Sequence, residues 1–289
     1  MRRVISLWLP RFATERRSHS RRERRAWRDR PLALVARDRG RLLLAAVNGP
    51  AAGEGLTPGL ALADARALLP ALATAPHDPA GDGAALARLA EWCGRYTPWS
   101  APCSTSEGSG FGPGGAGGLL LDITGCAHLF ARSRQARSGA VDGETALLKD
   151  LVGRLGRLGF TARAGLADTP GAAWALARFA TGPASPCPTS PWSVAPPGET
   201  SAALDPLPPA ALRLPGAAVE LMARFGLRRV SALRALPSVT LTSRFGPQVQ
   251  PSSIRLRAQT SWRCSEIRSL SDLRSSPSSM PSVAIGRGV

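Results

Sequence analysis

Short apolar runs of strand length alternate along this chain with longer segments of helical periodicity, and this alternation limits the folds open to it. The predicted strands are residues 4–9 (VISLWL), 31–36 (PLALVA), 42–47 (LLLAAV), 119–121 (LLL) and 160–167 (FTARAGLA). The helices predicted between them cover residues 58–69, 83–96, 144–159 and 170–179. Strands interleaved with helices predict an α/β or α+β domain, and we take α+β as the expected fold class.

Two of these helices carry the same start signal. Thr57-Pro58 and Thr169-Pro170 each place a threonine N-cap before a proline at the first helical position. A third helix is recognised by its apolar stripe, in which Leu147, Leu151, Leu155 and Leu158 recur at helical spacing.

The charge of the chain predicts a polyanionic partner. The formal net charge is +17, carried by 36 arginines and a single lysine, Lys149. Nucleic acid and an anionic membrane surface both fit such an excess. Abundant Ala, Gly and Pro are typical of a GC-rich genome, so codon bias also contributes arginine. No run of 18 apolar residues occurs, so no membrane-spanning helix and no membrane partner are expected.

Cysteines and histidines predict neither a disulfide framework nor a metal centre. The five cysteines are odd in number and show no paired CxxC spacing, and the three histidines are scattered. This usage fits the reducing cytoplasm, where we expect the protein to be nucleoid-associated. No metal and no cofactor are predicted.

The basic stretch at residues 15–30 has two interpretations. Its arginines, Arg21 and Arg24 among them, contact DNA phosphates or form a solvated helix face, and the sequence leaves both open.

The C-terminal third is predicted to be a separate unit. Residues 181–209 are rich in Pro and Ser and read as a linker, and residues 210–249 read as a helix–hairpin–helix. In the hairpin, Gly226 permits a tight turn whose backbone N–H groups can face a phosphate, with Arg228 and Arg229 beside it. Plain helical packing is the alternative. Arg244 is a further predicted DNA contact.

Residues 250–289 differ in composition from the rest of the chain. They are rich in serine, poor in alanine and without clear periodicity. Two explanations fit this composition: a reading-frame disruption in a GC-rich gene, or an ordinary disordered tail.

Several motifs together resemble one known family. They are VISLWLPRFATE, RLLLAAVNGPAAGEGLTPGLALADARALLP, RYTPW, GGLLLDITGCAHLF, GFTARAGLADTPGAAWALARF and FGLRRVSALRALPSVTLTSRFG, in that order. Residues 1–249 are similar to the ImuB-like proteins, divergent relatives of the Y-family translesion DNA polymerases. The resemblance implies a palm and fingers over residues 1–180 and a helical thumb over 210–249, with the little-finger domain missing.

The resemblance also implies that the catalytic residues are lost. Nucleotide addition needs carboxylates that hold two Mg²⁺ ions. The matching positions are Trp8 in the first strand and Gly117 and Gly118 before the second. Asp122 matches a later, structural aspartate that we expect to cap the turn at Thr124.

The resemblance also implies that the nucleotide-binding residues are lost. Gly49 and Ala52 stand where active relatives place a Tyr and an Arg, and the helix start DTPGAAW (168–174) lacks the lysine expected there. The resemblance therefore implies a non-catalytic DNA-binding adaptor in damage-induced mutagenesis, C-terminally truncated, with a sliding clamp, an ImuA-like protein and an error-prone replicative-type polymerase as partners. An active Y-family polymerase and a generic helix–hairpin–helix DNA-binding protein are the alternatives.

Overall fold

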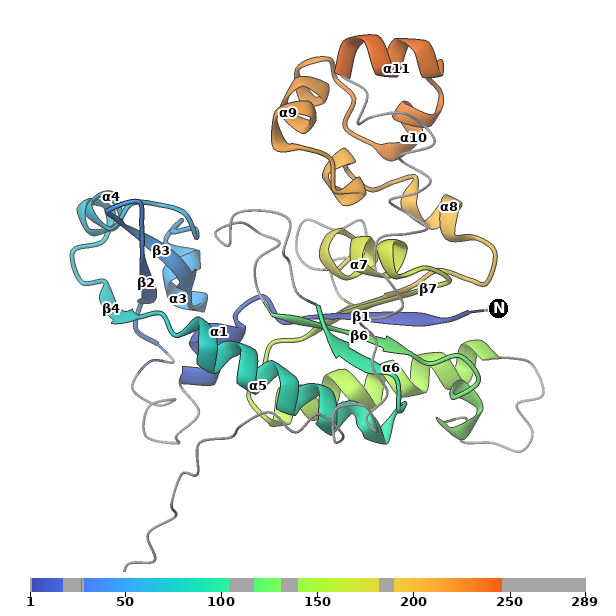
Figure 1. Cartoon of the computed structure of the whole chain (residues 1–289), viewed down its shortest axis with the longest axis horizontal. Coiled ribbons are helices and arrows are strands. Elements are labelled where there is room, and N and C mark those ends of the chain that lie inside the picture. The colour runs from blue at the N-terminus through green and yellow to red at the C-terminus, as the bar shows by residue number, and fades with distance from the viewer. Residues whose placement is uncertain are drawn as a thin grey trace, which may run out of the picture.

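The computed structural model describes residues 2–17, 27, 29–103, 117–130, 140–181 and 190–245. Within them the chain forms a large sheet with helices on both faces, a smaller sheet at one end, and a group of helices above the large sheet (Figure 1). No helix in the described ranges is both long and apolar enough to cross a membrane.

The large sheet has five strands in the order β5-β6-β1-β7-β8. Their bounds are β1 Val4–Trp8, β5 Ser100–Pro102, β6 Gly118–Asp122, β7 Arg163–Ala167 and β8 Trp192–Val194. The central strand β1 runs antiparallel to both β6 and β7, while β8 lies parallel to β7. Because side chains alternate along β1, Ile5 and Leu7 face one side of the sheet and Ser6 and Trp8 face the other.

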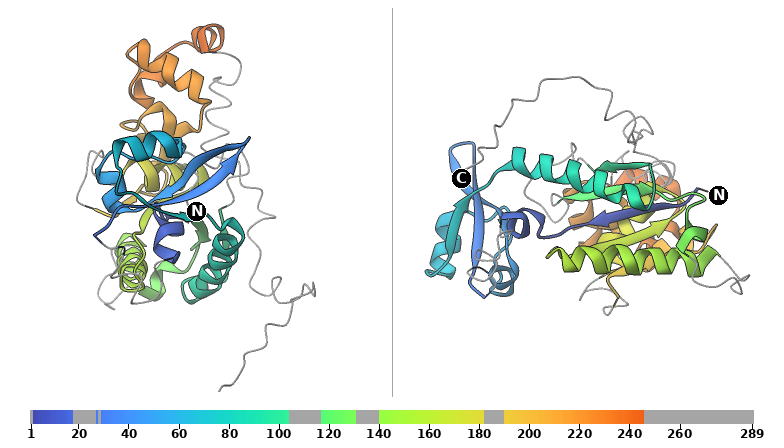
Figure 2. Two further views of the ribbon diagram at one scale, coloured as in Figure 1. Left: turned by 90° about the vertical axis from the view of Figure 1, so that its left-hand side faces the viewer. Right: turned by 90° about the horizontal axis from the view of Figure 1, so that it is seen from below.

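Two long helices cover the first of these sides (Figure 2). They are α5 Pro79–Trp92, continued by the 3₁₀ turn η1 Cys93–Arg95, and α6 Ala140–Arg157, preceded by η2 Ala127–Phe130. Ile5 and Leu7 pack there against Leu147, Leu151 and Leu155, all fully buried. The predicted stripe ends one turn early, because Leu158 follows the helix and is 39% exposed.

Helix α7, Pro170–Phe179, lies on the opposite side of the sheet. Thr169 caps it by accepting a hydrogen bond from the N–H of Ala172, which confirms the predicted start. The helix packs very closely on β7, since a Cβ at Gly165 would lie 2.2 Å from the Ala173 carbonyl oxygen. Residues 170–178 are buried throughout, because α7 is enclosed by the sheet below and the C-terminal helices above.

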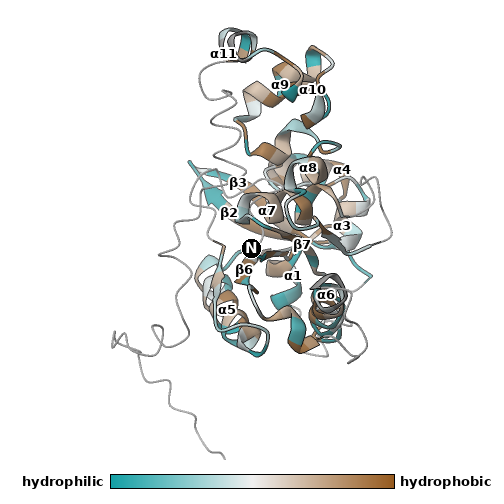
Figure 3. Ribbon diagram, turned by 90° about the vertical axis from the view of Figure 1, so that its right-hand side faces the viewer, coloured by the Kyte–Doolittle hydropathy of each residue, from teal (hydrophilic) through white to brown (hydrophobic). Residues whose placement is uncertain are grey.

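The small sheet has the order β3-β2-β4, with β2 Leu32–Asp38, β3 Arg41–Val47 and β4 Ala73–Pro76. The remaining helices at this end of the molecule are α1 Phe12–Arg17, α3 Gly49–Gly53 and α4 Leu62–Leu68. The β2–β3 hairpin is as predicted, and its hydrophilic tip projects from the molecule (Figure 3).

Two predicted helix starts are wrong. Helix α4 begins at Leu62 rather than at Pro58, because Gly59 turns the chain in the left-handed region (φ 93°) directly after Thr57-Pro58. Helix α5 begins at Pro79, earlier than predicted, because Asp78 accepts a hydrogen bond from the N–H of Gly81 and caps it.

The C-terminal helices are α8 Thr200–Leu204, η3 Pro209–Leu212, α9 Gly216–Arg224, α10 Val230–Arg234 and α11 Ser238–Phe245. Trp174 and Leu176 of α7 share one apolar cluster with Leu207, Met222 and Leu233 of this group. Strand β8 and helix α8 both fall within residues 181–209, so the prediction of an irregular linker is wrong for the described second half of that segment. Residues 246–289, which include the predicted tail, lie outside the described residues.

A buried ion-pair network joins the N-terminus to α6 and β7. Arg3 donates to both carboxylate oxygens of Glu144 at 2.7 and 2.8 Å and to Asp168 at 2.8 Å. Arg3 is 6% exposed and Glu144 1%. A buried cation with two carboxylate partners fixes how β1, α6 and the residue after β7 meet.

Candidate functional site

The three positions predicted to have lost catalytic carboxylates lie together in the structure. Trp8 ends β1 and pairs directly with Gly118 of β6 on one side and with Arg163 of β7 on the other. The N–H of Leu9 donates to the carbonyl of Gly117 at 2.9 Å, which extends the same ladder by one residue. The sheet therefore brings Trp8, Gly117 and Gly118 to one end of β1.

Neither glycine has free space for a side chain. A Cβ at Gly118 would lie 2.8 Å from the carbonyl oxygen of Leu7, which belongs to the backbone of β1. A Cβ at Gly117 would lie 3.0 Å from Leu86 and 3.1 Å from the ring of Phe12. The packing around both positions is therefore fitted to glycine.

Asp122 lies at the opposite end of the strand pair. It is paired with Val4, four residues along β1 from Trp8, which corresponds to roughly 13 Å. Its Oδ1 accepts from the Thr124 N–H at 3.1 Å and from the Thr124 hydroxyl at 2.6 Å, and its Oδ2 accepts from Arg2 at 2.9 Å. The predicted role in capping the turn at Thr124 is confirmed.

Two arginines lie beside Trp8. The guanidinium carbons of Arg163 and Arg178 each lie 5.3 Å from the Trp8 ring centroid, and that of Arg178 is 4.5 Å from Trp174. Arg178 is only 7% exposed, and burial lowers its pKa to about 10, with the nearby charge of Arg213 acting in the same direction. Burial and the charge of Arg11 likewise lower the pKa of Arg163.

Sequence reasoning missed these two arginines, because they come from β7 and α7 and meet Trp8 only through the strand register. The described ranges contain no group of three or more His, Cys, Asp or Glu side chains placed to hold a metal ion. This end of the sheet is thus cationic, with two guanidinium groups beside the position where the resemblance expects carboxylates.

The predicted nucleotide positions are also bordered by arginine. Gly49 and Ala52 lie in the short helix α3, and a Cβ at Gly49 would be 3.1 Å from Nη1 of Arg11. The start of α7, which the resemblance singled out for its missing lysine, follows Ala167 and so lies near Val4. The last turn of α7, which carries Arg178, is the part that faces Trp8.

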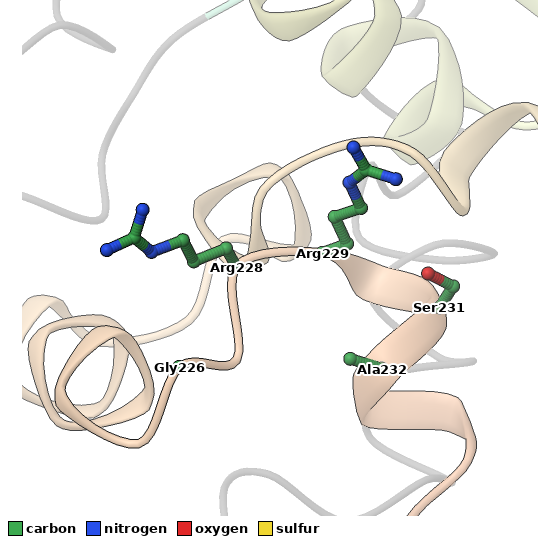
Figure 4. Close-up of a pocket in the computed structure, with 5 residues that line it drawn as sticks. All are labelled: Gly226, Arg228, Arg229, Ser231 and Ala232. Carbon is green, nitrogen blue, oxygen red and sulfur yellow. The ribbon is translucent and has the colours of Figure 1, made fainter.

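The glycine turn between α9 and α10 has the predicted shape. Gly226 has a φ of 76° and lies between the two helices, where it lines a shallow pocket with Arg228, Arg229, Ser231 and Ala232 (Figure 4). Both arginines are exposed, and their side chains extend away from each other.

Four backbone N–H groups around this turn are bonded within the protein. Those of Gly226 and Leu227 donate to the carbonyls of Ala223 and Met222, and those of Val230 and Ser231 donate to Leu207 and Asp205. The side chains of Arg228 and Arg229 are exposed beside these four bonded donors.

The other predicted DNA contacts have different environments. Arg244 is exposed on α11, with its guanidinium carbon 5.8 Å from the ring of Phe225, which is itself 54% exposed. Arg21 and Arg24 lie outside the described residues. Arg16, from the same basic stretch, is paired with Asp78 and Asp82, so its charge is largely neutralised.

Comparison with known proteins places these observations in a family context. No protein-family model matches the chain. Over 192 residues, or 66% of its length, it is 48% identical to Protein ImuB of Caulobacter vibrioides strain NA1000 / CB15N, and equally so to that of strain ATCC 19089 / CIP 103742 / CB 15. The chain spans only 35% of the length of these curated relatives.

Solved structures share the fold at low sequence identity. DinB from Sulfolobus solfataricus matches with a TM-score of 0.65 and 14% identity, over 89% of this chain and 66% of that one. A post-insertion binary complex of Dbh DNA polymerase matches with a TM-score of 0.65 and 15% identity, over 91% of this chain and 69% of that one. The predicted resemblance to ImuB-like proteins and the Y-family fold is confirmed, including the mixed α and β architecture of palm and fingers.

Proposed function

We propose that this chain, which is ImuB-like over two thirds of its length and Y-family-like in fold, is a non-catalytic DNA-binding adaptor in translesion synthesis. In this proposal the polymerase fold holds a damaged or primer–template DNA, while another protein carries out nucleotide addition.

The proposal depends mainly on one observation: the charged side chains beside Trp8 are positive rather than negative. Two-metal phosphoryl transfer requires acidic ligands that hold the ions about 4 Å apart. Here the guanidinium carbons of Arg163 and Arg178 each lie 5.3 Å from the Trp8 ring centroid. A divalent ion about 5 Å from one such group is repelled by roughly 6–7 kcal/mol at an effective dielectric constant of 20. The positive charge beside Trp8 therefore disfavours binding of the two divalent metal ions that an active polymerase requires.

DNA binding is supported by exposed arginines on the C-terminal helices. Arg228 and Arg229 flank Gly226, and Arg244 lies over the exposed ring of Phe225. Arginine side chains of this kind bind the phosphate backbone without reading the bases, so we expect affinity with little sequence preference and a steep dependence on salt. We assign this unit as the thumb, and residues 1–180 as palm and fingers.

The proposed partners follow from the resemblance to ImuB-like proteins. They are a sliding clamp, an ImuA-like protein and an error-prone replicative-type polymerase, which would meet the chain on DNA in the cytoplasm. Because this chain spans 35% of the curated relatives, its contacts with each partner require direct measurement.

Two assays on the full chain test the proposal. Primer extension with Mg²⁺ or Mn²⁺ should give no template-directed product, and DNA binding by fluorescence anisotropy should persist in EDTA. The double variant R228A/R229A should bind more weakly and lower the slope of log K against log salt by about 2. The control R154A removes an arginine from α6, on the other face of the sheet, and should leave that slope unchanged. Extension that disappears in D122A would instead establish an active polymerase.

A further inference from the structure

The side of the large sheet that faces α7 contains a cluster of buried donors without an acceptor. They are Nε1 of Trp8, Nε1 of Trp174, and Nε and Nη1 of Arg178, none of which has a hydrogen-bond partner in the described structure. The contacts between Arg178 and the two indole rings place all four donors in one cluster, which we call the indole–arginine cluster.

Stacking does not compensate for these unmade hydrogen bonds. A cation–π contact is favourable but does not satisfy the N–H groups of the guanidinium or of the indole. Each buried donor left unsatisfied lowers stability, and a charged group does so more strongly. An acceptor of opposite charge would satisfy these donors and remove the cost of leaving them buried without a partner.

The protein does not supply that acceptor within the described ranges. Carboxylates beside the sheet are engaged elsewhere: Glu15 with Thr161, Asp122 with Arg2 and Thr124, and Glu144 and Asp168 with Arg3. Further cations border the cluster instead. Arg163 stacks on Trp8 while its Nη1 donates to the Thr181 carbonyl at 3.2 Å, and Arg213 lies 4.9 Å from the Trp174 ring.

One side of the cluster lies near the surface. Trp8 and Arg163 are half-buried, so the end of β1 that carries them reaches the surface, whereas Arg178 and Trp174 lie behind them at 7% exposure each.

We propose that the indole–arginine cluster, together with Arg163, is a metal-independent binding site for a phosphate group of DNA. A phosphate suits this set of donors better than a carboxylate, because its additional oxygen can accept from a further donor and guanidinium binds it through two parallel hydrogen bonds. The inference rests on the proposed DNA-binding role and adds a specific contact to it: guanidinium groups provide at Trp8 the positive charge that metal ions would provide in an active enzyme.

The test uses thermal unfolding of the full chain in phosphate-free buffer containing EDTA. Inorganic phosphate, added against chloride of equal ionic strength, should raise Tm by roughly 3–6 °C at ten times its dissociation constant. R178M keeps an unbranched, flexible side chain but removes the guanidinium group with its charge and donors, so the rise should disappear. The matched control is R95M, because Arg95 stacks on Trp92 at 4.2 Å but is exposed and remote from the cluster.

The stability of R178M without phosphate separates a binding role from a structural one. R178M also loses the contacts of the guanidinium with the Trp8 and Trp174 rings, so we expect a small loss of Tm for a binding residue and a large loss for a residue needed for packing. Equal phosphate responses in R178M and the parent, or a large loss of Tm in R178M without phosphate, would overturn the inference. R178K, which keeps the charge without the planar fork, should bind phosphate at least tenfold more weakly.

A DNA measurement separates this inference from the proposed function. In EDTA, R178M should bind a primer–template duplex three- to tenfold more weakly than the parent, while R95M binds equally. If R178M binds DNA normally and extension is still absent, the phosphate site is refuted and the adaptor proposal stands.

Discussion

Replacing Gly118 by alanine tests whether the end of β1 still has room for a polymerase's side chains. The new Cβ would lie 2.8 Å from the Leu7 carbonyl oxygen, closer than real Cβ atoms approach, and that oxygen belongs to the backbone of the central strand. Relief requires β1 and β6 to move apart where Trp8 pairs with Gly118. Overpacking of this kind costs about 1–3 kcal/mol, which lowers Tm by about 3–10 °C for a domain of this size.

The matched control is Gly153→Ala in the middle of α6, where no heavy atom lies within 4 Å of the new Cβ. Alanine is the better helix former, so this variant should be more stable by about 0.5–1 kcal/mol. Calorimetry on both variants gives the comparison. If G118A is as stable as the parent, the sheet accommodates a side chain there and the argument that its packing requires glycine is refuted.

Three further predictions concern the parts of the fold that hold this site. R3M leaves Glu144 buried without its partner and should lower the free energy of unfolding, measured in urea, by about 3–5 kcal/mol. A loss below about 1 kcal/mol would show that the ion-pair network does not stabilise the fold. Burial opposes ionisation of Asp168, but hydrogen bonds from the Gly198 N–H, Arg3 and Thr200 outweigh it and lower its pKa below the ordinary 3.8. This contribution to stability is therefore complete above about pH 4 and lost as pH falls further, so Tm should drop more steeply there in the parent than in D168N. L151A, in the core between α6 and the sheet, should cost about 2–5 kcal/mol, whereas L42A, at an exposed position of the β2–β3 hairpin, should change the unfolding free energy little.

The sequence predicts the elements of this fold better than their boundaries. The apolar runs at residues 4–9 and 42–47 form strands, and Thr169-Pro170 starts a helix, because in each case local conformational preference and burial agree. At Thr57-Pro58 the same cap signal fails, because Gly59 takes a positive φ and the chain turns before the helix begins. The strand at 192–194 was missed, because it is short, proline-flanked and defined only by its pairing with β7.

The candidate site was likewise predicted only in part from the sequence. The resemblance identified Trp8 and Gly118, and their adjacency follows once β1 and β6 are paired. Arg163 and Arg178 carry no local motif, and they meet Trp8 only because β7 pairs with β1 and α7 then runs back along the sheet. At the glycine turn the sequence gives the shape correctly but not the hydrogen bonds that Leu207 and Asp205 make from 20 or more residues away.

Mn²⁺ uptake, followed by electron paramagnetic resonance, tests the central claim most directly. The full chain is titrated with Mn²⁺ in the presence of primer–template DNA and a nucleoside triphosphate, with DNA and nucleotide alone as the reference. If guanidinium groups occupy the place of the metal-binding carboxylates, the free Mn²⁺ signal should match the reference at every addition. Withdrawal of two Mn²⁺ ions per chain, with uptake lost in D122N, would show that the protein assembles a two-metal centre and that the account is wrong.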